Sequence, residues 1–162
     1  MFGVFDSPPV DREGLRRWIA DRYADVPFID GDALASWLAD RSRPAPVVVD
    51  VRSPKERGVS MLPGAIGAND GAAAAAALST LDPSVPIVVY CAGGLRSAKA
   101  ARVLIAAGHG DVHNLEGGIF AWANADRPVQ CEGRTTRYVH PSDDKWGALL
   151  ARDRHAWTPT PE

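Results

Sequence analysis

Two short apolar runs constrain the fold of this chain more than any other feature. Residues 47–51 (VVVDV) and 87–90 (IVVY) are continuous and rich in β-branched side chains, and each run follows a proline. Alternation of polar and apolar residues is typical of a strand with one face in water, whereas continuous runs indicate strands buried on both faces of a parallel sheet. We therefore expect both runs to be buried strands of an α/β domain.

Shorter segments complete the predicted sheet. Further strands are expected at residues 26–29, 65–68 and 112–115, and helices at 33–39, at 72–77 and after the second apolar run. The helix after that run should have Ser97 as its N-cap and Gly108 as its stop. Strands that alternate with helices predict a three-layer α/β/α domain with a five-stranded, mainly parallel sheet.

Length and composition agree with one such domain. The 162 residues, 46% hydrophobic and 23% charged, fit a single globular domain with flanking extensions. The expected division is an N-terminal helical extension at 1–25, the α/β domain at 26–130 and a polar C-terminal extension at 131–162.

Several classes of function are disfavoured. A net charge of -2 gives no reason to expect a polyanionic partner such as nucleic acid, whose binding proteins usually show a basic face. The first ten residues do not resemble a signal peptide and no apolar run reaches 18 residues, so we expect no membrane association and a cytoplasmic location, where thiols stay reduced. The four histidines lack metal-ligand spacing, and neither a metal nor another cofactor is expected. These histidines are His109, His113, His140 and His155.

The loop after the second run carries the candidate chemistry. Cys91 directly follows this strand, and open α/β folds bind ligands at the carboxyl ends of their strands. Gly93 and Gly94 allow positive φ angles, so successive backbone N–H groups can turn inward and form an anion-binding nest. The helix that follows adds its positive end, and Arg96 adds a permanent charge. A thiol in such surroundings is a stronger acid than free cysteine, which makes Cys91 a candidate nucleophile.

Five stretches of the chain together resemble the rhodanese family over residues 26–130. They are residues 48–52 with Glu56, residues 62–66 (LPGAI), residues 87–91 (IVVYC), residues 94–97 (GLRS) and residues 116–122 (EGGIFAW). The chain departs from the usual family pattern in two places. Residues 60–62 (SML) replace glycine-histidine-isoleucine, and Arg57 stands where an aromatic residue is common.

The resemblance implies a sulfurtransferase. In this family the loop cysteine takes a sulfane sulfur from a donor such as thiosulfate, holds it as a persulfide among the loop amides, and passes it to cyanide or a thiol. A protein can also be the acceptor. By this resemblance Cys91 is the catalytic residue, and Ala92, Gly93, Gly94, Leu95, Arg96 and Ser97 bind the substrate.

Two other functions remain open at this point. A non-catalytic persulfide carrier or binding module would use the same loop. Cysteine phosphatases and arsenate reductases also use a cysteine and an arginine, but the phosphatases separate the two by five residues. Here only four residues intervene between Cys91 and Arg96. The smaller loop favours a sulfur atom over a tetrahedral phosphoryl group.

Three residues outside the loop have competing interpretations. Asp50 and Arg52 could contact a substrate, but pairing with neighbouring groups is favoured because an acid near a persulfide would repel anions. Cys131 could resolve a persulfide on Cys91, although a bystander thiol is the default interpretation.

Overall fold

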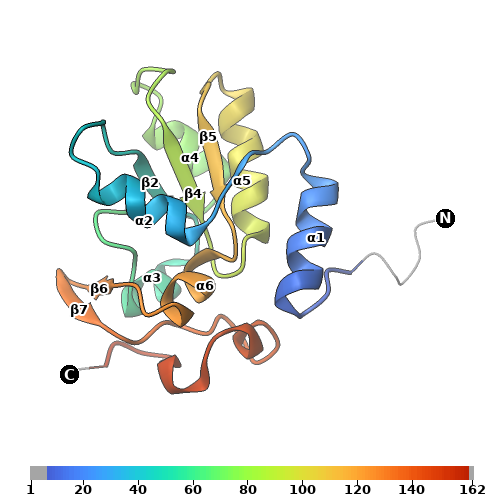
Figure 1. Ribbon diagram of the computed structural model, residues 1–162, viewed down its shortest axis with the longest axis vertical. Coiled ribbons are helices and arrows are strands. Elements are labelled where there is room, and N and C mark those ends of the chain that lie inside the picture. The colour runs from blue at the N-terminus through green and yellow to red at the C-terminus, as the bar shows by residue number, and fades with distance from the viewer. Residues whose placement is uncertain (1–6, 161–162) are drawn as a thin grey trace.

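The computed structural model describes residues 7–160 and contains a five-stranded, entirely parallel sheet in the order β1-β5-β4-β2-β3 (Figure 1). This confirms the predicted α/β class and all five predicted strands. The strands are β1 (Phe28–Ile29), β2 (Val47–Asp50), β3 (Ile66–Gly67), β4 (Ile87–Tyr90) and β5 (Val112–Leu115).

The two apolar runs form the centre of this sheet. β4 lies between β2 and β5, with Val47 opposite Ile87 and Ile87 opposite Val112. Every residue of β4 is buried. A strand covered on both faces has no exposed position for a polar side chain, which explains the uninterrupted apolar sequence.

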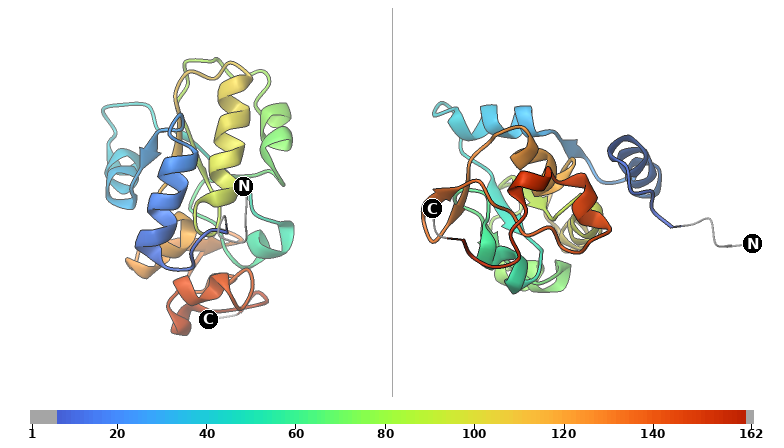
Figure 2. Two further views of the ribbon diagram at one scale, coloured as in Figure 1. Left: turned by 90° about the vertical axis from the view of Figure 1, so that its right-hand side faces the viewer. Right: turned by 90° about the horizontal axis from the view of Figure 1, so that it is seen from below.

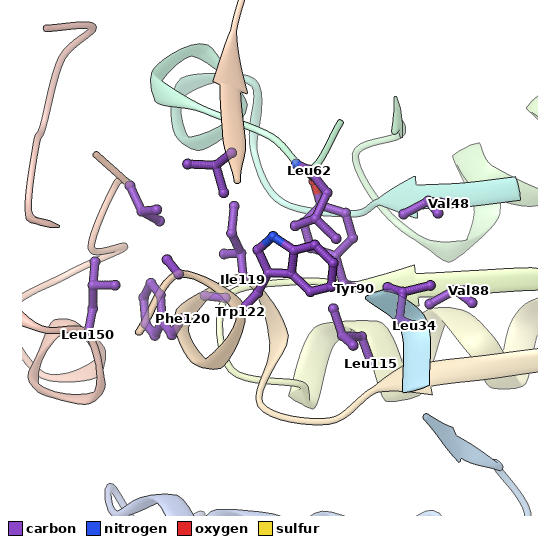
Figure 3. Close-up of a cluster of buried hydrophobic side chains, with 14 of the residues drawn as sticks. Leu34, Val48, Leu62, Val88, Tyr90, Leu115, Ile119, Phe120, Trp122 and Leu150 are labelled. Atoms are coloured by element: carbon purple, nitrogen blue, oxygen red, sulfur yellow. Dashed lines mark hydrogen bonds between the residues drawn. The ribbon is translucent and has the colours of Figure 1, made fainter. Parts of the chain in front are cut away.

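Helices cover both faces of the sheet. Val48, Val88 and Tyr90 face one layer, where they pack with Leu34 of α2 and Trp122 of α6 (Figure 3). The alternate residues of β2 and β4 face α4 and α5 on the other side. The helices of the domain are α2 (Gly31–Ala39), α3 (Pro54–Val59), α4 (Gly71–Ala77), α5 (Leu95–Ala106) and α6 (Gly118–Asn124).

The N-terminal helix α1 (Arg12–Arg22) packs beside α5 (Figures 1 and 2). Leu15 and Ile19 are its buried residues, and they pack against Ala98 of α5. The sequence predicts a helix in this extension, and the structure confirms it.

The chain after α6 crosses the carboxyl end of the sheet (Figure 2). An antiparallel hairpin forms first, from β6 (Val129–Cys131) and β7 (Arg134–Thr136), and two 3-10 helices follow, η1 (Trp146–Leu149) and η2 (Arg152–Arg154). Met61 and Gln130 exchange backbone hydrogen bonds of 2.9 and 2.8 Å, which join the hairpin to the domain. The division at residues 25 and 130 stays a prediction. Within residues 7–160, no helix has the length and apolar character needed to cross a membrane.

Candidate active site

Cys91 lies at the carboxyl end of the central strand β4, at the start of the turn into α5. Its side chain is 1% exposed. The helix begins at Leu95, with Gly94 as its N-cap at φ +112°. The prediction of Ser97 as N-cap is therefore wrong by one turn. Gly94 can adopt the left-handed backbone that ends the loop early, and the Ser97 side chain is directed toward the loop.

Two backbone N–H groups converge on the Cys91 sulfur. The Gly94 nitrogen is 3.2 Å from Sγ and the Ser97 nitrogen is 3.4 Å from it. The Ser97 hydroxyl is also 3.3 Å from Sγ, but it donates its single proton at 2.6 Å to Oδ1 of Asn114. Thus the two amides are the donors that can stabilise negative charge on this sulfur.

Asn114 holds the loop from the neighbouring strand β5. It accepts from Ser97, and its Nδ2 donates at 3.0 Å to the carbonyl oxygen of Gly94. The side chain is 1% exposed, so these bonds replace water for the buried amide. This role of Asn114 was not predicted from the sequence. The feature that could have predicted it is a polar residue within a buried strand.

Backbone N–H groups at the start of α6 bind carbonyl oxygens of the same loop. The nitrogens of Ile119 and Phe120 donate to the carbonyl oxygens of Cys91 and Ala92, at 2.9 and 3.1 Å. Gly118 has a φ of +57°, and a Cβ there would lie 2.5 and 2.4 Å from these two oxygens. Only glycine permits this close approach. These contacts orient the two carbonyl groups toward α6, so the amides of Gly94 and Ser97 remain available to the sulfur.

Arg96 is held by a carboxylate on α3. Its Nη1 and Nη2 donate to Oε1 and Oε2 of Glu56 at 2.7 and 2.9 Å. The hydroxyl of Ser142 donates to the same Oε2 at 2.6 Å, and Ser53 donates to Oε1 as the N-cap of α3. Burial raises the pKa of Glu56, but the hydrogen bonds from Arg96 and Ser142 outweigh it and hold this pKa well below its ordinary value.

The pairing of Arg96 with Glu56 was not predicted from the sequence. Glu56 was recognised only as part of the family pattern, and Ser142 was not recognised at all. Ser142 follows Glu56 by 86 residues, so no local pattern could have linked the two side chains.

Asp50 and Arg52 form a buried pair behind the loop, as the sequence analysis favoured. Both side chains are fully buried, and Nη2 of Arg52 lies 2.8 Å from Oδ2 of Asp50. The Tyr90 hydroxyl donates to the same Oδ2 at 2.6 Å and accepts from the nitrogen of Leu62 at 3.0 Å. Burial and the Asp50 charge raise the pKa of Tyr90 well above its usual value. The network links β2, β4 and the chain before β3, which supports the strand end that carries Cys91.

A cavity of about 310 Å³ lies in front of Cys91. The loop contributes Ala92, Gly93, Leu95 and Arg96 to its lining. Three other parts of the chain supply the remaining walls. They are Leu15 of α1, Glu56 of α3, and Ser142, Asp143 and Trp146 near the C-terminus.

Cys131 is not among the described residues that line this cavity. It ends β6, is half-buried, and its Sγ lies 3.5 Å from the carbonyl oxygen of Gly58. Both cysteines are free thiols.

Comparisons with known proteins agree with this geometry. A family model described as the rhodanese-like domain matches residues 34–125. A sulfurtransferase of Allochromatium vinosum is 35% identical over 83 residues, which cover 51% of this chain and 77% of that protein. Thiosulfate sulfurtransferase 18 of Arabidopsis thaliana is 43% identical over 54 residues, covering 33% of this chain and 40% of that protein. The solution structure of a rhodanese-like domain from Anabaena superposes with a TM-score of 0.59 at 30% identity, covering 67% of this chain and 83% of that one.

Proposed function

This chain belongs to the rhodanese-like family, and from that premise we propose that it is a sulfurtransferase whose persulfide forms on Cys91. The observation that carries the proposal is the convergence of the Gly94 and Ser97 amides on the Cys91 sulfur. Fixed N–H dipoles aimed at an atom that bears negative charge stabilise the charged state without reorganisation. The substrate-binding role of residues 92–97 is part of this proposal.

The proposed reaction has two displacements. The Cys91 thiolate attacks the sulfane sulfur of a donor such as thiosulfate, the sulfur-sulfur bond of the donor breaks, and sulfite leaves with the electron pair. A nucleophilic acceptor, cyanide or a thiolate, then attacks the outer sulfur of the persulfide. Thiocyanate or a new persulfide leaves, and the Cys91 thiolate is restored. Covalent catalysis of this kind divides one transfer into two simpler steps.

Loop size supports sulfur over phosphate. The donor amides of Gly94 and Ser97 are within 3.4 Å of one sulfur atom. A bound phosphoryl group needs amides spaced around three oxygens, which a wider ring provides. The four-residue interval between Cys91 and Arg96 therefore favours a persulfide as the species held in the loop.

Turnover measurements test the proposal. The chain should convert thiosulfate and cyanide to thiocyanate and sulfite, and Cys91→Ser should abolish this activity. Hydrolysis of an aryl phosphate, measured in parallel, should remain at background. A stable Cys91 persulfide with negligible turnover would favour the carrier function instead, and phosphate hydrolysis that depends on Cys91 would overturn the assignment.

A further inference from the structure

The cavity at Cys91 is walled by two segments that lie outside the family match at residues 34–125. Leu15 comes from α1, and Ser142, Asp143 and Trp146 come from the C-terminal segment, residues 137–157. The two segments meet beside the loop, because Trp146 and Leu149 pack against the cluster that contains Leu15. These walls therefore come from parts of the chain outside the matched residues.

The charges that face this cavity are already compensated. Arg96 is the only cation among the described residues that line it, and both terminal nitrogens of Arg96 bind Glu56. Ser142 fixes the same carboxylate. The other charged lining residue is Asp143, which is exposed and negative. Lys145 lies outside the lining, with Nζ 5.5 Å from the ring centroid of Trp146. An inorganic dianion thus finds no uncompensated positive side chain among the described residues of the lining.

The remaining wall is apolar. Leu15, Leu95 and Trp146 are half-buried or buried and line the same space of about 310 Å³ as Cys91. An apolar cavity of about 150 Å³ already holds a benzene molecule. An aromatic indole adds a favourable contact when another ring packs against it.

We propose that the preferred sulfur donor is a small organic compound in which an apolar group is joined to the sulfur-donating group, and that Trp146 determines this specificity. The inference rests on the proposed function, since it concerns the donor for the persulfide on Cys91. With an arenethiosulfonate, the Cys91 thiolate attacks the terminal sulfur, the sulfur-sulfur bond breaks, and the arenesulfinate leaves with the electron pair. The apolar ring lies against Trp146 and Leu15 while the transferred sulfur reaches the loop amides.

Benzenethiosulfonate and thiosulfate are a suitable pair of probes. Both transfer a sulfane sulfur, but the first is a monoanion with an aromatic ring and the second is a dianion without one. We expect kcat/KM for benzenethiosulfonate to exceed that for thiosulfate at least tenfold. Trp146→Ala should lower the value for benzenethiosulfonate about three- to tenfold, as expected for the loss of one aromatic contact. The value for thiosulfate should change less than about twofold.

Two further variants separate specificity from folding. Trp146→Phe should keep most of the preference, because it retains a ring. Trp157→Ala is the matched control, since Trp157 belongs to the same segment but is 46% exposed and lies outside the cavity lining. The ratio of the two kcat/KM values is measured on one sample, so a loss of folded protein cancels from it.

The outcomes test the donor specificity separately from the sulfurtransferase function. Equal use of both donors, or a ratio that Trp146→Ala leaves unchanged, would overturn the specificity and leave the sulfurtransferase function standing. Failure of both donors to place sulfur on Cys91 would overturn the proposed function together with the inference.

Discussion

Cys91 and Cys131 carry the same side chain in two unlike settings. Cys91 ends a central parallel strand, is 1% exposed, and receives two backbone amides at its sulfur. Cys131 ends a strand of the antiparallel hairpin, is half-buried, and faces the carbonyl oxygen of Gly58. A backbone N–H group can donate to a sulfur that carries negative charge, whereas a carbonyl oxygen cannot. The direction of the backbone around the sulfur, more than the presence of a cysteine, therefore favours Cys91 as the nucleophile.

The largest expected difference between the two settings is in persulfide formation. Excess thiosulfate should add one sulfur, about 32 Da, to Cys91 and none to Cys131, because within residues 7–160 backbone N–H groups converge on the sulfur of Cys91 and a carbonyl oxygen faces that of Cys131. Mass spectrometry of the intact chain and of its peptides measures this. Cys131→Ser should label fully and Cys91→Ser should not label. Sulfur found on Cys131 in the parent chain would remove the distinction.

A change of loop length should give the next largest effect. One glycine inserted between Gly94 and Leu95 moves the Gly94 and Ser97 amides apart, so they no longer meet at one sulfur. Loss of one such donor costs about 100-fold or more in related charge-stabilising sites, and we expect a similar fall in kcat for sulfur transfer. The widened loop should also bind phosphate before it gains any hydrolysis.

The hairpin offers a control for this insertion. A glycine added between Glu132 and Gly133 extends a turn where Gly133 has no close neighbour, and it should leave sulfur transfer within about twofold of the parent. Parent-like transfer by the variant lengthened at Gly94 would show that convergence on the sulfur does not set the chemistry.

The smallest expected effect concerns pH and Glu56. Burial raises the pKa of Glu56, but the bonds from Arg96 and Ser142 lower it further, below the value of about 4.3 expected in the unfolded chain. The unfolded state therefore binds more protons at acidic pH, and the stabilisation by Glu56 is complete above about pH 5 and is lost as pH falls. Glu56→Gln should lower the free energy of unfolding by about 1–3 kcal/mol at pH 7, and this difference should shrink toward pH 3.

Denaturant unfolding at several pH values measures that dependence. The exposed Glu132 on the hairpin provides the control, because it makes no comparable bonds within residues 7–160, and Glu132→Gln should stay within about 0.5 kcal/mol of the parent at every pH. A Glu56→Gln difference that does not vary with pH would show that the charge of Glu56 contributes nothing to the folded state.

The sequence pattern within short segments was sufficient to predict the strands of the sheet and the position of Cys91 at the end of one of them. Continuous β-branched runs identified β2 and β4, and the glycines after Cys91 identified a loop able to turn its amides inward. The boundary of α5 was misplaced because Ser97 is a common N-cap, whereas the structure uses the positive φ of Gly94. Propensity ranks residue types but does not decide which of two nearby candidates the tertiary structure selects.

The rest of the site depends on contacts between distant parts of the chain. Glu56 reaches Arg96 across 40 residues and Ser142 across 86. The packing of Leu15 near Trp146 brings together the two ends of the described chain. Neither periodicity nor motif spacing reports such pairings, so the walls of the cavity became visible only in three dimensions.

The position of the C-terminal segment also affects how the molecule is assembled during translation. β4, the Cys91 loop and α6 are contiguous within residues 87–124, so they leave the ribosome before residues 137–157. The loop amides can surround the sulfur as soon as α6 is available to hold the Cys91 and Ala92 carbonyls. Trp146 and Ser142 arrive later. With the proposed roles of Cys91 and Trp146, a nascent chain would acquire its reactive sulfur first and its discrimination among donors only once the following segment has been synthesised.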